Sequence, residues 1–160
     1  MTALAVRGAT VTVVAARLAL GLLWLHEGYV KYHAGFGRSD ILLVVHSASS
    51  NPRVPGAFGW FAGEVMGRLA TPFGIAVPFI EVALGVAALA GVLPRATALA
   101  AIALLCSYWA ADQLVVQYPV MVVLAAIVLA GGALARAGSL PQALDRLRDR
   151  GRGPARAPSA

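Results

Sequence analysis

Ionisable side chains lie at short intervals inside a long apolar segment near the start of the chain. The stretch RLALGLLWLHEGYVK carries Arg17, His26, Glu27 and Lys31, within an apolar run that covers residues 9–30. An imidazole titrates near neutral pH, so His26 beside Glu27 could relay protons or contact a polar headgroup. Charges inside a membrane-spanning helix are costly, usually face a bundle interior and point to function.

Helical periodicity places several of these positions on one face. Five residues lie within about 40° of one another at 100° per residue: Arg17, Gly21, Trp24, Gly28 and Lys31. His26 lies nearly opposite this face, and Glu27 lies to its side. The glycines would let another helix or a flat ligand approach the backbone. Trp24 either packs in the core or stacks on such a ring, and Lys31 is expected to extend towards the membrane interface.

Glu81 is the second candidate, because it lies near the middle of the apolar segment PFIEVALGVAALAG. A carboxylate at that depth takes up a proton or needs a cationic partner. Counting ~1.5 Å per residue from the span ends brings Arg17 and His26 near Glu81 from opposite sides. One alternative is an Arg17–Glu81 ion pair whose sole role is to fix the register of the two helices. The other alternative is that Glu81 binds a ligand or carries a proton. The sequence leaves both alternatives open.

Asp112 is a further candidate, at the predicted outer end of a span. Tyr108 precedes it by one helical turn, and Gln113 and Gln117 follow it. Asp112 is either a ligand-binding residue or a solvated helix end.

No metal site is predicted. His33 and His46 could bind a metal ion together with Asp40, but their spacing is not diagnostic. The one cysteine, Cys106, is expected to be a buried, inert thiol.

The composition indicates an integral membrane protein. Hydrophobic residues make up 59% of the chain and charged residues 12%, and the mean hydropathy is +0.77. A soluble domain is usually about half apolar and a quarter charged. The net charge of +6 comes from basic residues near the chain ends, which indicates membrane orientation rather than nucleic-acid binding.

The predicted fold is all-α, an up-down membrane bundle of four helices, because the connections between apolar segments are short or moderate. The predicted spans are residues 9–31, 72–93, 96–115 and 119–135, within a membrane domain of residues 1–138. A basic tail of residues 139–160 follows, with an amphipathic helix over 139–149 that Ser139 caps and a disordered end.

The segment 32–71 is predicted to lie outside the membrane and to hold two short helices. Ser39 would cap a helix over Asp40–His46. The stretch 57–69 looks amphipathic, with a Glu64–Arg68 pair, and would lie in the interface plane or pack over the bundle mouth. Lys and Arg are concentrated near the other ends of the spans, so both termini are predicted to be cytoplasmic, in the cell membrane.

Two motifs resemble one family. The patterns R-L-x-L-G-x-x-W-L-x-x-G-x-x-K at 17–31 and P-x-x-E-x-x-x-G-x-x-x-x-x-G at 78–91 are similar to the DoxX/DoxD-like integral membrane proteins. By position, six residues match the family pattern: Arg17, Gly21, Gly28, Lys31, Glu81 and Gly85. The resemblance implies a four-helix membrane protein, and one branch is the small subunit of a thiosulfate:quinone oxidoreductase.

The sequence therefore supports two alternative functions. The first is a redox-associated membrane subunit that interacts with a quinone, with no covalently bound cofactor. Its catalytic candidates are Glu81, His26 and Glu27, and its ligand-binding candidates are Arg17, Trp24, Gly28, Lys31 and Asp112. The second is a non-catalytic scaffold that anchors a larger membrane complex. Either would contact the lipid bilayer and a protein partner or further copies of itself. A transporter is a third, weaker alternative.

Overall fold

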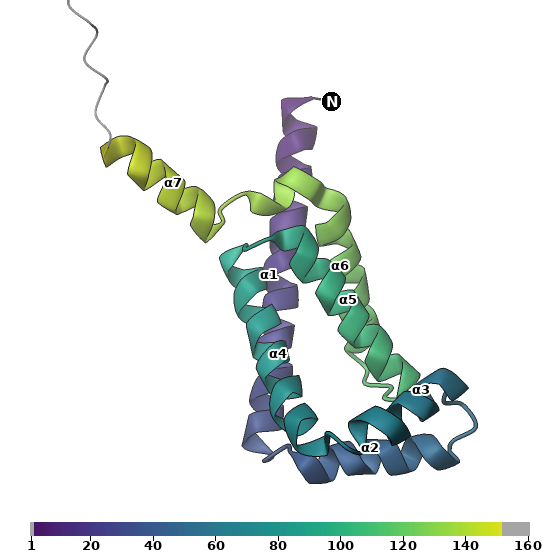
Figure 1. Ribbon diagram of the computed structural model, residues 1–160. Coiled ribbons are helices and arrows are strands. Elements are labelled where there is room, and N and C mark those ends of the chain that lie inside the picture. Colours follow the sequence, from purple (N-terminus) through teal and green to yellow (C-terminus); the bar gives the residue numbers. More distant parts are fainter. Residues whose placement is uncertain (1, 152–160) are drawn as a thin grey trace, which may run out of the picture.

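The computed structural model describes residues 2–151, in which the regular elements are all helices and no strand occurs (Figure 1). This confirms the all-α prediction for the described residues. The elements in chain order are α1 (Ala3–His33), α2 (Arg38–Ser50), α3 (Gly56–Phe61), the π-helix η1 (Ala62–Met66), α4 (Ala70–Ala90), α5 (Pro94–Ala110), α6 (Tyr118–Gly131), the 3-10 helix η2 (Gly132–Arg136) and α7 (Leu140–Gly151).

Three stretches of the described chain are long and apolar enough to cross a membrane. They are α1, α4 and the stretch Tyr118–Asp149, which begins with α6. Large apolar side chains point outward from all of these helices, for example Leu22, Phe79 and Val123. An outward apolar surface of this extent is typical of a protein that contacts lipid.

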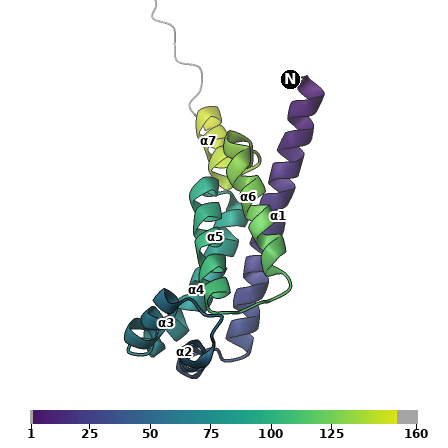
Figure 2. The ribbon, with the colours of Figure 1, turned by 90° about the vertical axis from the view of Figure 1, so that its right-hand side faces the viewer.

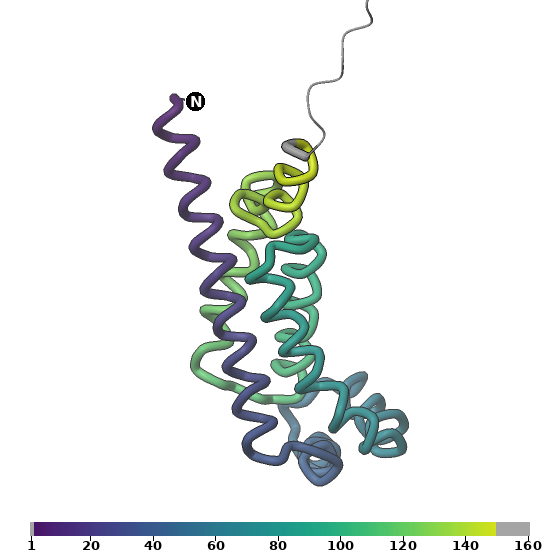
Figure 3. Tube along the Cα trace, turned by 90° about the vertical axis from the view of Figure 1, so that its left-hand side faces the viewer, coloured from purple at the N-terminus to yellow at the C-terminus, as the bar shows by residue number. Residues whose placement is uncertain are grey.

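The four longest apolar helices pack in a ring of contacts. α1 lies against α4 and α6, and α5 lies against α6 and α4 (Figures 1 and 2). α1 begins at the end of the molecule where α4 ends and α5 begins, which we call the terminal end. The first part of α1 stands clear of the other helices there (Figure 3). Buried side chains between the helices, among them Leu20, Trp24 and Met121, form the main core.

Close backbone contact between α1 and α4 depends on glycine. A Cβ atom added to Gly85 would lie 2.9 Å from the carbonyl oxygen of Gly21, and one added to Gly28 would lie 3.3 Å from that of Pro78. These distances are too short for larger residues without movement of a helix. The prediction that the glycine face of α1 admits another helix is confirmed.

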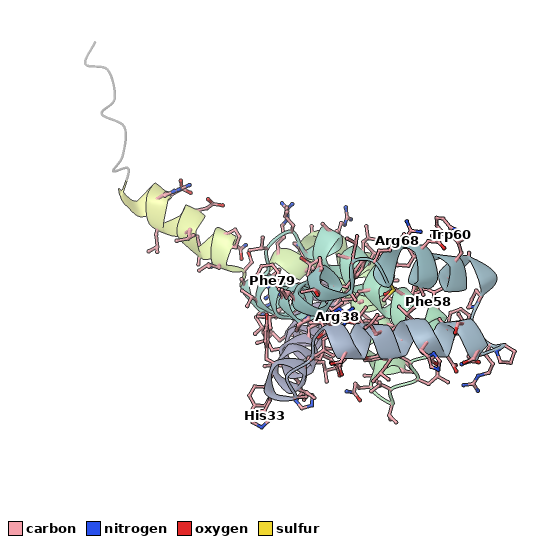
Figure 4. All side chains as sticks on the ribbon, turned by 60° about the horizontal axis from the view of Figure 1, so that its bottom comes forward. His33, Arg38, Phe58, Trp60, Arg68 and Phe79 are labelled. Atoms are coloured by element: carbon pink, nitrogen blue, oxygen red, sulfur yellow. The ribbon has the colours of Figure 1, made fainter. Side chains whose placement is uncertain are left out.

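Residues 34–69 cover the opposite end of the helices, and we call this segment the hood. Ile41, Ala48, Ala62 and Met66 form a second core with Ala70 at the start of α4. Phe58 and Phe61 pack against this core, whereas Trp60 points outward (Figure 4). The apolar side of the hood therefore packs on protein, which was the alternative to lying in the interface plane.

Several local predictions need correction. The hood's first helix begins at Arg38 and its cap is Gly37, not Ser39, because the Asp40 carboxylate accepts a hydrogen bond from the Gly37 N–H. The helix predicted over 57–69 is instead α3 followed by η1, although the predicted Glu64–Arg68 pair is confirmed. Cys106 is exposed, so its predicted burial is wrong; it lies on the outward face of α5.

α7 agrees closely with the amphipathic helix predicted over 139–149. The Ser139 hydroxyl accepts a hydrogen bond from the Gln142 N–H, as expected of a cap. α7 projects away from the other helices (Figure 1). The predicted disordered end extends beyond Gly151 and lies outside the described residues.

Candidate functional site

Glu81 of α4 is fully buried and lies at the centre of a polar cluster near the hood. Its Oε1 atom accepts hydrogen bonds from Lys31 Nζ at 2.7 Å and from the Tyr108 hydroxyl at 2.6 Å. Its Oε2 atom has no hydrogen-bond partner. A buried carboxylate normally has all its acceptor positions satisfied, so an unpaired oxygen indicates a place for a proton or a ligand group.

Glu27 extends the cluster along α1. It is 7% exposed, and one of its oxygens lies 3.3 Å from Lys31 Nζ and 3.3 Å from the Tyr118 hydroxyl. The Gln117 amide donates a hydrogen bond to the other oxygen. One ammonium group therefore serves two buried carboxylates. Counted as ionised groups, two carboxylates and one cation give the cluster a formal charge of −1.

The residues of this cluster meet because of their positions along four helices. Glu27 and Lys31 lie one turn apart on α1. Lys31 reaches Glu81 of α4, whereas Glu27 reaches the start of α6. Tyr108 near the end of α5 and Tyr118 at the start of α6 stack with ring centroids 5.3 Å apart. Lys31 Nζ lies 5.4 Å from the centroid of the Tyr108 ring, within cation–π range. Side chains from α1, α4, α5 and α6 thus meet at one level.

An apolar cavity of about 180 Å³ adjoins the cluster under the hood. Lys31 and Tyr108 belong both to the cluster and to the cavity wall, and Gln113 adds an amide. Four phenylalanines line the cavity: Phe36, Phe58, Phe61 and Phe73. A mostly apolar wall with a few converging polar groups is the usual form of a small-molecule site.

The Arg17–Glu81 pair, one of the two alternatives that the sequence left open, does not form. Arg17 is 2% exposed, but its Nε and Nη1 atoms have no hydrogen-bond partner. The contact between Gly21 and Gly85 sets the two helices so that Arg17 lies beside Gly91, ten residues and about 15 Å along α4 from Glu81. Lys31 replaces Arg17 as the partner, because helical side chains point towards the amino terminus and Lys31 therefore reaches back to Glu81. Its predicted extension to the interface is also wrong, since its side chain is 15% exposed.

Two other candidates on α1 take different places. His26 is exposed on the outward face, as its predicted angle implies, and the structure does not bring it to Glu81 or Glu27. Trp24 is fully buried and tilts against Tyr108 with ring centroids 6.5 Å apart, so it packs in the core. Its indole N–H lacks a partner.

The structure does not bring His33, His46 and Asp40 together as a group of metal ligands. His33 and His46 are exposed, and His33 stacks on Tyr29 and points outward (Figure 4). No group of three metal-ligating side chains occurs among residues 2–151.

Sequence reasoning missed the roles of Tyr108, Tyr118 and Gln117. All three lie within an otherwise apolar region around the short loop between α5 and α6. The sequence does contain an indication of these roles. The polar groups lie at the ends of two helices that only seven residues connect, so they must lie at one level, at the same end of the molecule as Lys31. From the sequence, Tyr108 and Gln117 were considered only as neighbours of Asp112, and Tyr118 was not considered a site residue.

Asp112 joins the hood to the loop between α5 and α6. It accepts hydrogen bonds from the Asn51 amide at 2.7 Å and from the Arg53 guanidinium at 3.1 Å. The structure therefore places it in a clamp outside the cavity wall, and not at the ligand-facing cluster. Arg53 and then Asn51 lower the pKa of Asp112 below its usual value.

This clamp is expected to loosen in acid. A carboxyl group whose pKa is lowered by folding stabilises the folded state above its unfolded pKa, near 4, and that contribution is lost as the pH falls through the lower folded value. Amide hydrogen exchange of residues 111–117, corrected for intrinsic rates, should therefore accelerate below about pH 4. Asp112→Asn should exchange faster at neutral pH and lose the acid dependence, whereas Glu64→Gln should leave it unchanged. Acid-independent exchange in the unsubstituted chain would contradict the clamp.

No family model matches the chain, and no curated protein or solved structure shows a significant match to it.

Proposed function

We propose that the chain spans the cell membrane four times, through α1, α4, α5 and α6, with both termini in the cytoplasm and the hood outside. α5 has 17 residues, a length of about 25 Å, and the three-residue connection after α4 requires it to return alongside α4. Arginines at the terminal end support the orientation; the described ones are Arg7, Arg95, Arg136, Arg146 and Arg148.

We further propose that the protein is a DoxX-like subunit of a membrane redox system and binds a quinone headgroup in the cavity under the hood. The observation that supports this most is that Lys31 and Tyr108 are shared by the cavity wall and the Glu81–Glu27 cluster. A flat ring fits between phenylalanine side chains, and a carbonyl oxygen needs a donor. The resemblance of residues 17–31 and 78–91 to the family agrees with this assignment.

The cavity suits a headgroup alone. Its volume of about 180 Å³ lies below the ~300–1,000 Å³ of sites for drug-sized ligands, so an isoprenoid tail would have to lie outside. Lys31 has three N–H donors and uses two on the carboxylates, which leaves one for a ligand carbonyl. Gln113 also lines the cavity and can supply a second donor from its side-chain amide.

The residues of this chain would hold protons beside the quinone and transfer them to it. A quinone supplies the chemistry of accepting two electrons and two protons. Lys31 would orient a ring carbonyl, Tyr108 and Glu81 would hold a proton beside it, and the phenylalanines would exclude water. Glu27, Tyr118 and Gln117 would extend the proton path towards the loop between α5 and α6.

A non-catalytic scaffold is the second candidate, and one surface favours it. A groove of about 500 Å³ lies on the outward side of α5 and α6, lined by Cys106, Trp109, Val116 and Val122 among others. Its wall is almost wholly apolar, which suits a helix of a membrane partner or of a second copy. The quinone experiment separates the two functions.

Blocking the cavity is expected to abolish headgroup binding. Ala76 lines the cavity, so Ala76→Phe in protein reconstituted into nanodiscs should weaken the binding of a short-chain quinone at least tenfold, a loss of ~1.4 kcal/mol. Ala83→Phe is the matched control, because Ala83 is exposed on the same helix. Glu81→Gln should leave insertion intact and stop quinone-dependent turnover. Equal affinity of both alanine variants, each shown to be folded, would refute the quinone site and leave the scaffold.

A further inference from the structure

Two adjoining clefts at the terminal end carry positive charge. The first, of about 410 Å³, lies between the start of α5 and η2 and includes Arg95 and Arg136. The second, of about 370 Å³, lies between the end of α4 and the start of α7 and shares Leu93 and Arg136 with the first. We call the two together the basic cleft.

Arg17 lies directly behind the basic cleft. A Cβ atom added to Gly91, which lines the cleft, would lie 1.9 Å from Arg17 Nη1 and 2.6 Å from the Cβ atom of Ser139, which also lines it. Arg17 is only 2% exposed, and its Nε and Nη1 atoms have no hydrogen-bond partner. A buried guanidinium with free donors beneath a cleft wall points to an anion nearby.

The charges around the basic cleft are nearly all of one sign. Among the described residues, Arg17, Arg95 and Arg136 take part in no salt bridge. Asp145 is the one acidic residue in the cleft wall. The free N–H groups at the start of α5, a helix of 17 residues, add a partial positive charge beside Arg95.

Exposed apolar side chains lie next to the cleft, which favours an anion that itself carries apolar chains. Leu93 at the cleft is 67% exposed, and Leu140 and Leu144 are exposed along α7. From its start at the cleft, α7 projects away from the other helices (Figure 1). The leucines of α7 lie on one side of the helix, and the remaining surface carries Asp145 and Asp149 together with Arg146 and Arg148. A helix with an apolar side and a charged side can lie on a membrane surface.

We propose that the basic cleft binds the phosphate of an anionic phospholipid. Arg95 and Arg136 contact the headgroup, Arg17 supports its charge from behind, and the acyl chains lie against Leu93 and the leucines of α7. Basic pockets between helices on the cytoplasmic side are suited to such headgroups. The site lies at the opposite end of the helices from the proposed quinone cavity, so each can fail without the other.

Lipid titration of the full-length protein tests this proposal. Detergent-solubilised protein is titrated with dioleoyl phosphatidylglycerol or dioleoyl phosphatidylcholine, and native mass spectrometry counts the bound lipids. One basic residue near an anionic surface corresponds to about fivefold in binding. Arg95→Gln with Arg136→Gln should therefore weaken phosphatidylglycerol binding about 25-fold and leave phosphatidylcholine binding unchanged.

Two controls decide between the outcomes. Arg38→Gln with Arg68→Gln removes the same charge from exposed positions of the hood and should change phosphatidylglycerol binding less than about twofold. Equal weakening by both double variants would overturn the site, because binding would then follow net charge alone. Competition by inorganic phosphate at concentrations equal to the lipid would overturn the lipid assignment in favour of a soluble anion.

Discussion

Replacing Lys31 with methionine is expected to lower the free energy of unfolding by about 3 kcal/mol. Methionine keeps the length of the side chain but removes the only cation that contacts Glu81 and Glu27 among the described residues. Two buried carboxylates would then face each other without compensation, and removal of one partner of a buried ion pair typically costs ~3–5 kcal/mol. The partial exposure of Lys31 places the expected cost at the lower end of this range.

Tryptophan fluorescence during denaturation provides the measurement, since the chain has three tryptophans and Trp24 lies beside the cluster. Adding Glu81→Gln to Lys31→Met should recover part of the loss, because one of the two uncompensated charges is removed. Arg38→Met is the matched control, as Arg38 is exposed and in no described salt bridge. If Lys31→Met unfolded at the same denaturant concentration as Arg38→Met, the ion cluster would not hold the helices together.

Replacing Gly85 with valine is expected to cost about 2 kcal/mol or more through overpacking. A Cβ atom at this position would lie 2.7 Å from Leu25 Cγ and 2.9 Å from the backbone oxygen of Gly21. The Leu25 side chain can rotate away, but the backbone oxygen can move only with all of α1. Separating α1 from α4 also lengthens the contact between Lys31 and Glu81, which lies one turn from Gly85.

Thermal unfolding in detergent should therefore show a lower midpoint for Gly85→Val, and quinone binding should weaken with it. Gly8→Val serves as the control, since Gly8 also lies within a helix but has no atom within 4 Å of an added Cβ. The control carries the same loss of helix propensity from a β-branched residue. Similar midpoints for the two variants would mean that the glycine contact does not set the distance between α1 and α4.

The sequence by itself predicted the features that depend on local periodicity and composition. Helical spacing placed Arg17, Gly21, Trp24 and Gly28 on one face, and all four are buried in the structure. Apolar segments long enough to cross a bilayer predicted the all-α class, because a helix satisfies its backbone hydrogen bonds within its own segment, as lipid requires. The expectation that charges of two neighbouring helices meet inside the protein is also confirmed, in the pair Lys31 and Glu81.

Only the tertiary structure decided which groups meet. The ends of the spans are uncertain in the sequence, so counting residues from them misplaces a side chain by several ångströms along the helix axis. Because of that error, Arg17 rather than Lys31 was considered as the partner of Glu81. The contact of Gly21 with Gly85 sets the axial register of α1 and α4, and no periodicity within one helix contains that information. Tyr108 and Tyr118 joined the cluster for the same reason, since their depth depends on how two further helices pack. The hood determined the cavity, because its phenylalanines complete a wall that no single segment forms.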